Sequence, residues 1–431
     1  APRRSRARRQ AAAVTLVGRR VELEVGPIAH GGHCVARWDG RVVFVRHSLP
    51  GERVVAEVTE GEEGASYLRA DAIEVLRAAP GRVERPCPFS GPGRCGGCDF
   101  QHLDLATQRQ LLATVVSEQL SRLAGVERDV IVEALPGSGG ASDDGLGWRT
   151  RVTFTSTPDG GLGLHRHRSH EVVRVDPCLI ADPRMHEVTT VPWPARQVEV
   201  AVSSTGDRLA VVDEPRGRLP DVGLTGAVDS AGERLRGRTY VTEQVQDRSF
   251  RVTGSGFWQV HPQAAATLVD AVLDVGRPTA GEQVVDLYAG AGLFSAFLAR
   301  AVGAGGRVDS VESDPGAARD ARRNLHDLAQ VRLLRSPVER AFSRGDLADR
   351  YDLVVLDPPR TGARARVVQQ VAATGARGVV YVACDPAALA RDVATFAGHG
   401  YVLSTLRAFD LFPMTRHVEC VALLEPRHLT A

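Results

Sequence analysis

Lysine is absent from this chain of 431 residues, whose 53 basic residues are all arginine. The absence excludes any mechanism that needs a lysine nucleophile or a Schiff base. No stretch approaches the roughly 18 uninterrupted apolar residues of a membrane-spanning helix, so we expect no membrane partner. Hydrophobic residues make up 43% and charged residues 24%. That composition is typical of a soluble globular protein with more than one buried core.

Cysteine is also scarce. The seven cysteines are odd in number and mostly clustered, unlike the cysteines of a secreted disulfide framework. No signal-peptide pattern opens the sequence. We therefore expect a protein of the reducing cytoplasm, and nothing in the sequence implies a protein partner.

Charge of either sign is nearly balanced, at a net +1, but it is unevenly spread. Residues 1–20 contain seven arginines and no acidic residue, so the remainder is mildly acidic. A basic arm on an acidic body favours an anionic partner, nucleic acid above all. A solvated tail without a partner is the alternative, and the lack of acids is also compatible with a transit peptide.

The order of sequence patterns predicts three regions. Residues 14–76 read as short strands separated by glycine turns, which fits an OB-like β-barrel that binds RNA, although a barrel without a ligand has the same pattern. Residues 80–252 are expected to form a mainly β central domain that opens with a cysteine-rich loop, contains a helix over 104–124 and carries a basic turn at 165–168, and that holds RNA together with the barrel. From 253 to 431 strands and helices alternate, which predicts a Rossmann-like α/β domain with a doubly wound sheet.

A buried strand at 284–287 ends in a glycine turn that opens a helix. Doubly wound sheets bind cofactors at the carboxyl ends of such strands, which here carry Asp286 and then Gly290. The next strand ends in Glu312, whose carboxylate can accept both hydroxyls of a ribose. Because Ser295 replaces the third glycine of a dinucleotide site, the two acids favour S-adenosylmethionine. A structural turn beside a solvated glutamate is the alternative.

Two further strands are followed by candidate functional residues. Asp357 is followed by two prolines, which stiffen the loop and hold the carboxylate over the cofactor crevice. Methylases of base amino groups usually carry an aromatic residue after these prolines, so Arg360 counts against that class. Cys384 precedes a helix that begins near residue 387. Since a helix N-terminus lowers the pKa of a thiol, we expect a nucleophile rather than an inert core cysteine.

Alternation over residues 417–423 predicts a strand that carries His417 and Glu419 on one face and Cys420 on the other. Glu419 is a candidate general base, with a salt-bridged edge glutamate as the alternative. A thiolate, a base and a methyl donor are what methyl transfer to a pyrimidine carbon requires. The thiolate adds to C6, C5 attacks the methyl group, and the base removes the C5 proton so that the thiolate leaves.

Four other cysteines form a candidate metal site: Cys87, Cys95, Cys98 and Cys178. Four thiolates can hold zinc or an iron–sulfur cluster, and the spacing alone leaves the metal open. The Cys-Gly-Gly-Cys turn argues against four unrelated free cysteines.

Over nearly its whole length the sequence resembles the bacterial RNA 5-methyluridine (uracil-C5) methyltransferases. Residues 26–58 look like the TRAM barrel of that family, 257–259 (Phe-Trp-Gln) like its Phe-Phe-Gln, 381–392 like its nucleophile motif, and 409–419 like its Asp-x-Phe-Pro-x-Thr-x-His-x-Glu motif. The resemblance implies S-adenosylmethionine and a [4Fe-4S] cluster as cofactors, RNA as partner, and the helix at 104–124 packed on the catalytic domain.

The resemblance also gives each motif residue an expected role. It implies Cys384 as the nucleophile and Glu419 as the base. It implies that the four clustered cysteines are the ligands of the [4Fe-4S] cluster. Together with the strand ends it predicts this cofactor-binding set: Gln259, Asp286, Tyr288, Gly290, Glu312 and Asp357.

Three residues depart from the family pattern: Asp385 stands where Asn is usual, Leu293 where a polar residue is frequent, and Met414 where Gln is common. They bear on activity or substrate choice, not on the reaction class. We expect methylation of uridine C5 in structured RNA, with 23S ribosomal RNA favoured over uridine 54 of transfer RNA. The rivals are an amine-directed methylase, which would not need Cys384, and an RNA-binding iron–sulfur protein with altered methylase activity.

Overall fold

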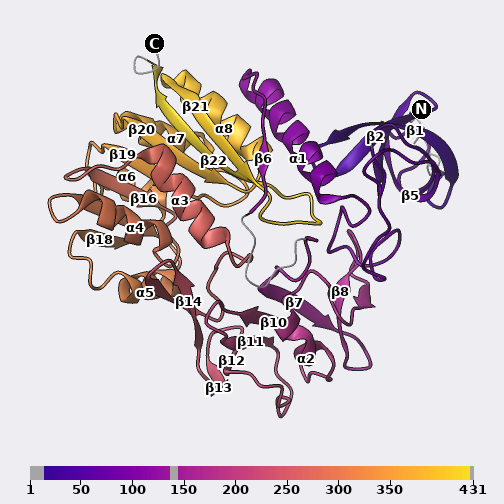
Figure 1. Ribbon diagram of the computed structural model, residues 1–431, viewed down its shortest axis with the longest axis horizontal. Coiled ribbons are helices and arrows are strands. Elements are labelled where there is room, and N and C mark those ends of the chain that lie inside the picture. Colours follow the sequence, from indigo (N-terminus) through magenta and orange to yellow (C-terminus); the bar gives the residue numbers. More distant parts are fainter. Residues whose placement is uncertain (1–13, 136–143, 428–431) are drawn as a thin grey trace, which may run out of the picture. The chain divides into compact units, whose positions relative to one another are not determined.

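The computed structural model describes residues 14–135 and 144–427. The chain divides into two compact units, Ala1–Glu84 and Arg85–Ala431 (Figure 1). Most of the basic arm predicted over residues 1–20 lies outside the described residues. Within the described ranges no helix is long and apolar enough to cross a membrane.

The first unit contains a closed β-barrel, as expected, in the strand order β1-β2-β3-β5-β4. Its strands are β1 (Arg20–Ala29), β2 (His33–Trp38), β3 (Arg41–Arg46), β4 (Arg53–Glu60) and β5 (Tyr67–Arg77). Alternate residues of β1 and β4 point into the barrel, because side chains alternate between the two faces of a strand. The fully buried Glu52 carboxylate closes one end, accepting hydrogen bonds from the Leu49 backbone N–H (2.8 Å) and from Arg82 Nη2 (2.8 Å).

The second unit begins with a mainly β region built around a mixed sheet in the order β13-β12-β11-β10-β7-β8-β9. Its elements are β7 (Arg151–Ser156), β8 (Leu162–His165), β9 (Val172–Arg174), η2 (Pro183–Met185), α2 (His186–Thr189), β10 (Gln197–Val202), β11 (Arg208–Asp213), β12 (Gly226–Asp229) and β13 (Arg234–Gly237). A separate hairpin follows, β14 (Tyr240–Val245) with β15 (Arg248–Thr253). The core of the sheet includes Trp148, Phe154 and three of the clustered cysteines.

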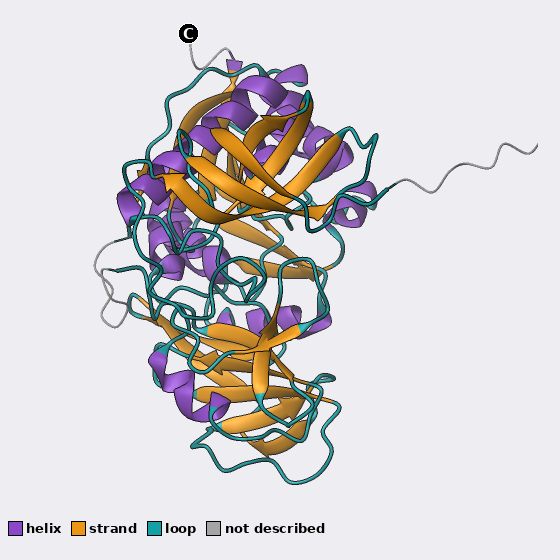
Figure 2. Cartoon of the chain, turned by 90° about the vertical axis from the view of Figure 1, so that its right-hand side faces the viewer, coloured by secondary structure: helices purple, strands orange, loops and turns teal. Residues whose placement is uncertain are grey.

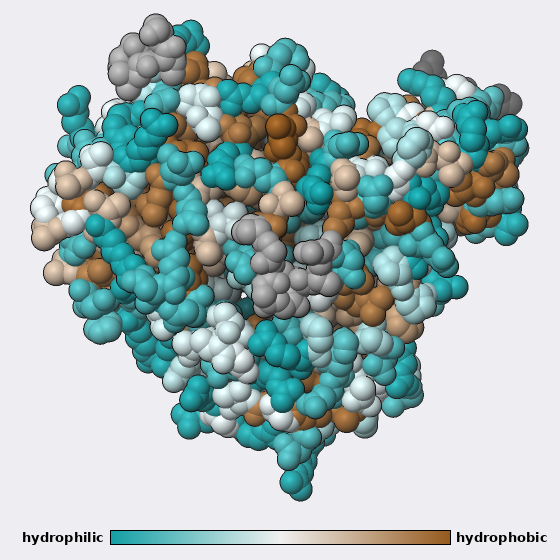
Figure 3. Space-filling model, viewed as in Figure 1, coloured by the Kyte–Doolittle hydropathy of each residue, from teal (hydrophilic) through white to brown (hydrophobic). Residues whose placement is uncertain are grey.

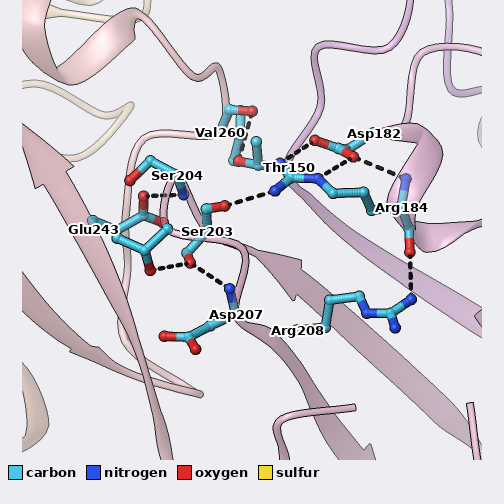
Figure 4. Close-up of polar contacts among 10 residues, drawn as sticks. Thr150, Asp182, Arg184, Ser203, Ser204, Asp207, Arg208, Glu243 and Val260 are labelled. Atoms are coloured by element: carbon cyan, nitrogen blue, oxygen red, sulfur yellow. Dashed lines mark hydrogen bonds and ion pairs between the residues drawn. The ribbon is translucent and has the colours of Figure 1, made fainter. Parts of the chain in front are cut away.

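Polar contacts fix this region to the segments that approach the catalytic domain (Figure 4). Thr150 donates its backbone N–H to the carbonyl of Val260 at 2.8 Å. Glu243 of β14 accepts the backbone N–H of Ser204 at 3.0 Å, and Arg184 donates to the carbonyl of Ser203 at 3.0 Å. The bond between Thr150 and Val260 holds the chain around residues 148–150 against residue 260, two stretches that meet again in the site below.

A doubly wound sheet forms the catalytic domain, as predicted, in the order β18-β17-β16-β19-β20-β22-β21-β6 (Figure 1). Its strands are β6 (Val132–Glu133), β16 (Gln283–Leu287), β17 (Arg307–Glu312), β18 (Val331–Arg335), β19 (Leu353–Leu356), β20 (Gly378–Ala383), β21 (Tyr401–Phe409) and β22 (Glu419–Pro426). The strands from β18 to β20 are parallel, whereas β22 is antiparallel to both of its neighbours. The central strands β19 and β20 are buried throughout, because helices cover both faces of such a sheet. In Figure 2 most of the helices lie in the upper part of the view, whereas strands and loops make up most of the lower part.

The helices form two rows. One row contains α3 with α4; the other contains α6, α7, α8 and α1. Their bounds, with those of α5 and the short helix η1, are α1 (Leu105–Gln119), η1 (Leu120–Ala124), α3 (Ala264–Gly276), α4 (Leu293–Val302), α5 (Pro315–Asn324), α6 (Val338–Ser343), α7 (Arg364–Ala373) and α8 (Pro386–Gly398). Thus α1 and η1, which precede the central sheet in the chain, pack on α8 of the catalytic domain. Hydrophilic side chains cover most of the face shown in Figure 3.

Candidate active site

A cavity of about 740 Å³ opens in the second unit, beside the carboxyl ends of the parallel strands. Most of the residues predicted for catalysis and cofactor binding line it together: Gln259, Tyr288, Gly290, Glu312, Asp357, Cys384 and Glu419. A volume of this size is typical of small-molecule and cofactor sites. The strand ends that the sequence marks out therefore meet at one place.

One side of the cavity is built by the turn after β16 and the end of β17. Tyr288 and Gly290 both adopt positive φ angles, +64° and +56°, which wrap the backbone tightly around this corner. The Gly290 backbone N–H donates to Glu312 Oε2 at 2.8 Å, and the Asp314 N–H donates to Oε1 of the same carboxylate at 2.6 Å. Glu312 is thus held in a fixed orientation while still lining the cavity.

Asp286 is placed differently from the other predicted cofactor residues. It is fully buried and does not line the cavity. Its Oδ2 accepts a hydrogen bond from Ser295 Oγ at 2.6 Å, and that hydroxyl also lies 2.8 Å from Ser310 Oγ. Burial raises the pKa of Asp286 to about 7. The geometry makes this carboxylate a support beneath the glycine turn.

The loop after β19 carries Asp357 into the cavity. Burial, and then the charge of Asp286, raise the pKa of Asp357 to about 7. Hydrogen bonds link the far end of the loop to helix α8. Asp392 of α8 accepts the Ala363 N–H of the loop at 2.7 Å, and it also accepts the Tyr381 hydroxyl of β20 at 2.6 Å. This buried pair fixes the Asp357 loop relative to Cys384, which lies between Tyr381 and Asp392 in the chain.

Cys384 lines the cavity between β20 and α8, and is half-buried. Burial, and then the neighbouring Glu419, raise the pKa of its thiol to about 12, while Arg360 lowers it. The expectation that the helix N-terminus lowers this pKa is therefore wrong for the free protein. Desolvation outweighs the helix, and the capping side chain of α8 is itself acidic: Asp385 accepts the Ala388 N–H at 2.8 Å and raises the thiol pKa further.

Glu419 is the first residue of β22 and is only 4% exposed. Burial, and then Asp357, raise the pKa of Glu419 well above its ordinary value, and Arg360 opposes the shift. Its neighbour Cys420 is fully buried and does not line the cavity, as the alternation of the strand predicts. His417 precedes the strand and lines the cavity as well.

The cavity is also lined by residues that were not predicted to act in catalysis or cofactor binding, and five of them are arginine or histidine: Arg149, His167, Arg360, Arg416 and His417. Arg360 and Arg416 are exposed, whereas burial, and then Arg360, lower the pKa of His417 to about 4 and keep it neutral. The sequence feature that could have identified Arg360 as a cavity residue is its position directly after the Asp-Pro-Pro loop. Arg149 and His167 belong to the mainly β region, and nothing in their local sequence says that they approach a distant catalytic turn.

The four clustered cysteines also come together. Cys87, Cys95, Cys98 and Cys178 are buried, are not joined by disulfides, and line a separate cavity of about 20 Å³. That is about the space of one water molecule. Burial raises the pKa of Cys95 to about 11 and raises those of Cys98 and Cys178, and the neighbouring cysteines add to the shift in each case. Within residues 14–135 and 144–427, no group of three or more His, Cys, Asp or Glu side chains is placed to hold a metal ion.

Comparisons with known proteins agree with this architecture. Residues 14–73 match the TRAM domain, and residues 229–427 match the family described as tRNA (Uracil-5-)-methyltransferase. A protein of Streptomyces coelicolor described as an uncharacterized RNA methyltransferase is 49% identical, over 99% of this chain and 98% of its own length. A protein of Bifidobacterium longum with the same description is 38% identical, over 93% of this chain and 96% of its own length.

Among solved structures, Pyrococcus abyssi tRNA (uracil-54, C5)-methyltransferase in complex with S-adenosyl-L-homocysteine is similar, with a TM-score of 0.71 and 24% identity. The match covers 93% of this chain and 99% of that chain, so the two share their fold. Because relatives of up to 49% identity that are described as RNA methyltransferases align over nearly the full length, the chain belongs to the TRAM-containing RNA methyltransferases.

Proposed function

We propose that this protein methylates C5 of uridine in structured RNA through a covalent bond between Cys384 and C6 of the uracil ring. The observation that carries the proposal is the single cavity shared by Cys384, Glu419 and the Tyr288–Glu312 corner. A thiol, a carboxylate and a nucleoside-binding corner beside one another are the parts that the reaction needs.

The chain offers a fitting place for S-adenosylmethionine. Glu312 is already oriented by two backbone N–H groups, and its remaining lone pairs suit the hydroxyls of a ribose. A Cβ placed on Gly290 would meet no atom within 4 Å, so the turn leaves open space beside the backbone. Gln259 and Tyr288 line the same side. When bound, S-adenosylmethionine supplies an electrophilic methyl group.

The remaining steps fall to the side chains. Asp357 orients the edge of the uracil ring. Cys384 passes its proton to water and its sulfur adds to C6, so that the C5=C6 electron pair makes C5 nucleophilic; C5 then takes the methyl group, with S-adenosyl-L-homocysteine as the leaving group. Glu419 removes the C5 proton, and the electron pair returns to expel the Cys384 sulfur. Arg360 favours the charged forms of both Cys384 and Glu419.

RNA that carries 5-fluorouridine at the target tests the covalent mechanism, because fluorine cannot leave C5 as a proton. The wild-type protein should form an adduct that survives a denaturing gel. Cys384→Ala should form none, and Glu419→Gln should accumulate bound RNA even when the target is ordinary uridine. An active wild-type enzyme that forms no adduct would exclude covalent catalysis and favour an amine-directed methylase.

We further propose that the four clustered cysteines hold a [4Fe-4S] cluster. The donor chemistry fits, because the buried thiols of Cys87, Cys95 and Cys98 in one loop and of the distant Cys178 line one small cavity and form no disulfide. The purified protein should be brown, and Cys98→Ala should lose the visible absorbance together with the iron. Colourless protein that contains zinc would overturn the assignment.

As RNA target we propose 23S ribosomal RNA, since the combination of barrel and cluster resembles the members that act on it. Uridine 54 of transfer RNA is the alternative, and the family description and the Pyrococcus relative named above are consistent with it. Mapping 5-methyluridine in total RNA from a deletion strain separates the two. If the deletion strain lost 5-methyluridine from neither RNA, the result would favour an RNA-binding iron–sulfur protein with altered activity.

A further inference from the structure

The turn between β8 and β9 carries a run of basic side chains, and His167 of this run reaches the wall of the cavity. Residues 165–170 read His-Arg-His-Arg-Ser-His, and His167 at the centre of the run lines the cavity. Arg149, Arg360 and Arg416 line it as well, and the last two are exposed. The mouth of the cavity is therefore rich in arginine and histidine.

Backbone contacts fix this turn in place. The Gly96 N–H donates to the His165 carbonyl at 2.9 Å, and Cys95 forms a β-bridge with Arg166. A Cβ on Gly96 would lie 2.5 Å from the backbone nitrogen of His167, closer than real contacts allow. Only glycine permits this approach, so the Cys-Gly-Gly-Cys turn and the basic turn form one rigid wall.

Charge is divided between the inside of the cavity and its edge. Glu312, Asp357 and Glu419 line the cavity, and their carboxyl groups offer a phosphate oxygen no positive charge. Arg166 is not a lining residue; its guanidinium is 41% exposed and pairs with the exposed Glu171 at 2.8 Å. A surface ion pair of this kind is weak, so it yields readily to a phosphate. The arrangement admits a neutral uracil ring and holds a phosphodiester at the rim.

We propose that the β8–β9 turn is a phosphate-binding edge that grips the RNA backbone beside the flipped uridine, with Arg166 and Arg168 as its main contacts. An enzyme that works on a base drawn out of its stack must hold the backbone on either side of it. The inference rests on the proposed function, because it takes RNA as the substrate.

The test measures how RNA binding depends on salt. The full-length protein is titrated with a fluorescein-labelled oligouridylate of about 12 nucleotides, a length within the site size of single-strand-binding modules. Dissociation constants are recorded between about 50 and 300 mM KCl. Each phosphate contact on a single strand contributes about 0.7 to the slope of log K against log salt. Arg166→Ala/Arg168→Ala should lower that slope by about 1.4 and weaken binding about tenfold near 0.15 M salt.

Arg174→Ala is the matched control. Arg174 lies at the far end of the same hairpin, is 55% exposed and pairs with Asp159 at 2.9 Å, but does not line the cavity. Its slope should equal that of the wild type. Arg166→Lys/Arg168→Lys keeps the charge and should keep most of the slope.

Turnover provides a second readout. At saturating RNA the alanine double variant should keep its kcat and show a raised KM, because the turn binds backbone and not the reacting atoms. A wild-type slope in the double variant, or a fall in kcat with KM unchanged, would overturn the proposal. Failure of the proposed function looks different: the wild-type protein would then neither methylate RNA nor form the 5-fluorouridine adduct.

Discussion

The raised pKa of Cys384 makes a prediction about the free protein that can be tested without RNA. Only the thiolate reacts with iodoacetamide, so the alkylation rate reports the thiolate fraction. With a pKa of about 12, Cys384 should be almost fully protonated at neutral pH although it lines an open cavity. The proposed nucleophile should therefore be nearly inert in the free protein.

The size of the effect follows from the pKa. At pH 7.5 an ordinary thiol of pKa about 8.5 is roughly 9% ionised, whereas a thiol of pKa about 12 is ionised to roughly 3 parts in 100,000. Alkylation of Cys384 should then be slower than that of an ordinary cysteine by a factor on the order of a thousand. Its rate should rise about tenfold for each pH unit up to pH 10, without a plateau.

Mass spectrometry of the peptide that contains Cys384, after timed exposure to iodoacetamide between about pH 7 and 10, gives the rate at one site. The same peptide in denatured protein serves as the ordinary-thiol control and should level off near pH 9. A plateau below pH 9 in the native protein would refute the reasoning, since it would mean that the thiolate forms without substrate.

Three further predictions follow from the contacts. Arg360 lowers the pKa of both Cys384 and Glu419, which in the proposed mechanism must lose their protons. Arg360→Gln should therefore move the acid limb of the profile of kcat/KM against pH to higher pH. An unmoved limb would show that a charge other than Arg360 lowers these two pKa values. Tyr381→Phe removes the 2.6 Å bond to Asp392, at a cost of about 1.5–3 kcal/mol, and should speed hydrogen exchange in residues 357–363 more than in β16. Glu52→Ala removes the buried acceptor of the Leu49 backbone N–H and of the partly buried Arg82, at a cost of about 1–3 kcal/mol, and should speed exchange across β1–β5; unchanged exchange would contradict the structural role assigned to Glu52.

Local patterns were sufficient to predict most of the fold. Alternation and glycine turns mark the barrel strands, and the buried runs that end at Leu287, Glu312, Leu356 and Ala383 mark the parallel sheet. The pairings that join distant parts of the chain were not readable in this way. The short strand β6 adds to the edge of the catalytic sheet beside β21, and a two-residue strand carries no periodic signal.

The candidate site likewise contains residues that the sequence could predict and residues that it could not. Residues at the ends of parallel strands could be predicted to meet, because topology brings those ends to one edge. Asp286 shows the limit of that reasoning, since its side chain turns into the protein toward Ser295. Arg149 and His167 reach the cavity from another sheet, through turns whose direction depends on packing rather than on local sequence.

Cys384 shows that the position of a side chain and its protonation state must be predicted separately. Helix geometry favours a thiolate at Cys384, but the same β20–α8 junction removes the sulfur from water and sets it near Glu419. Desolvation and a like charge both favour the neutral thiol. A thiolate beside a methylsulfonium group could itself be methylated, whereas a neutral thiol is a poor nucleophile toward it. If Cys384 is the nucleophile, as proposed, the burial that keeps it protonated in the free protein protects it from this side reaction, whereas Arg360, which lowers the pKa of both Cys384 and Glu419, opposes the effect of burial on each.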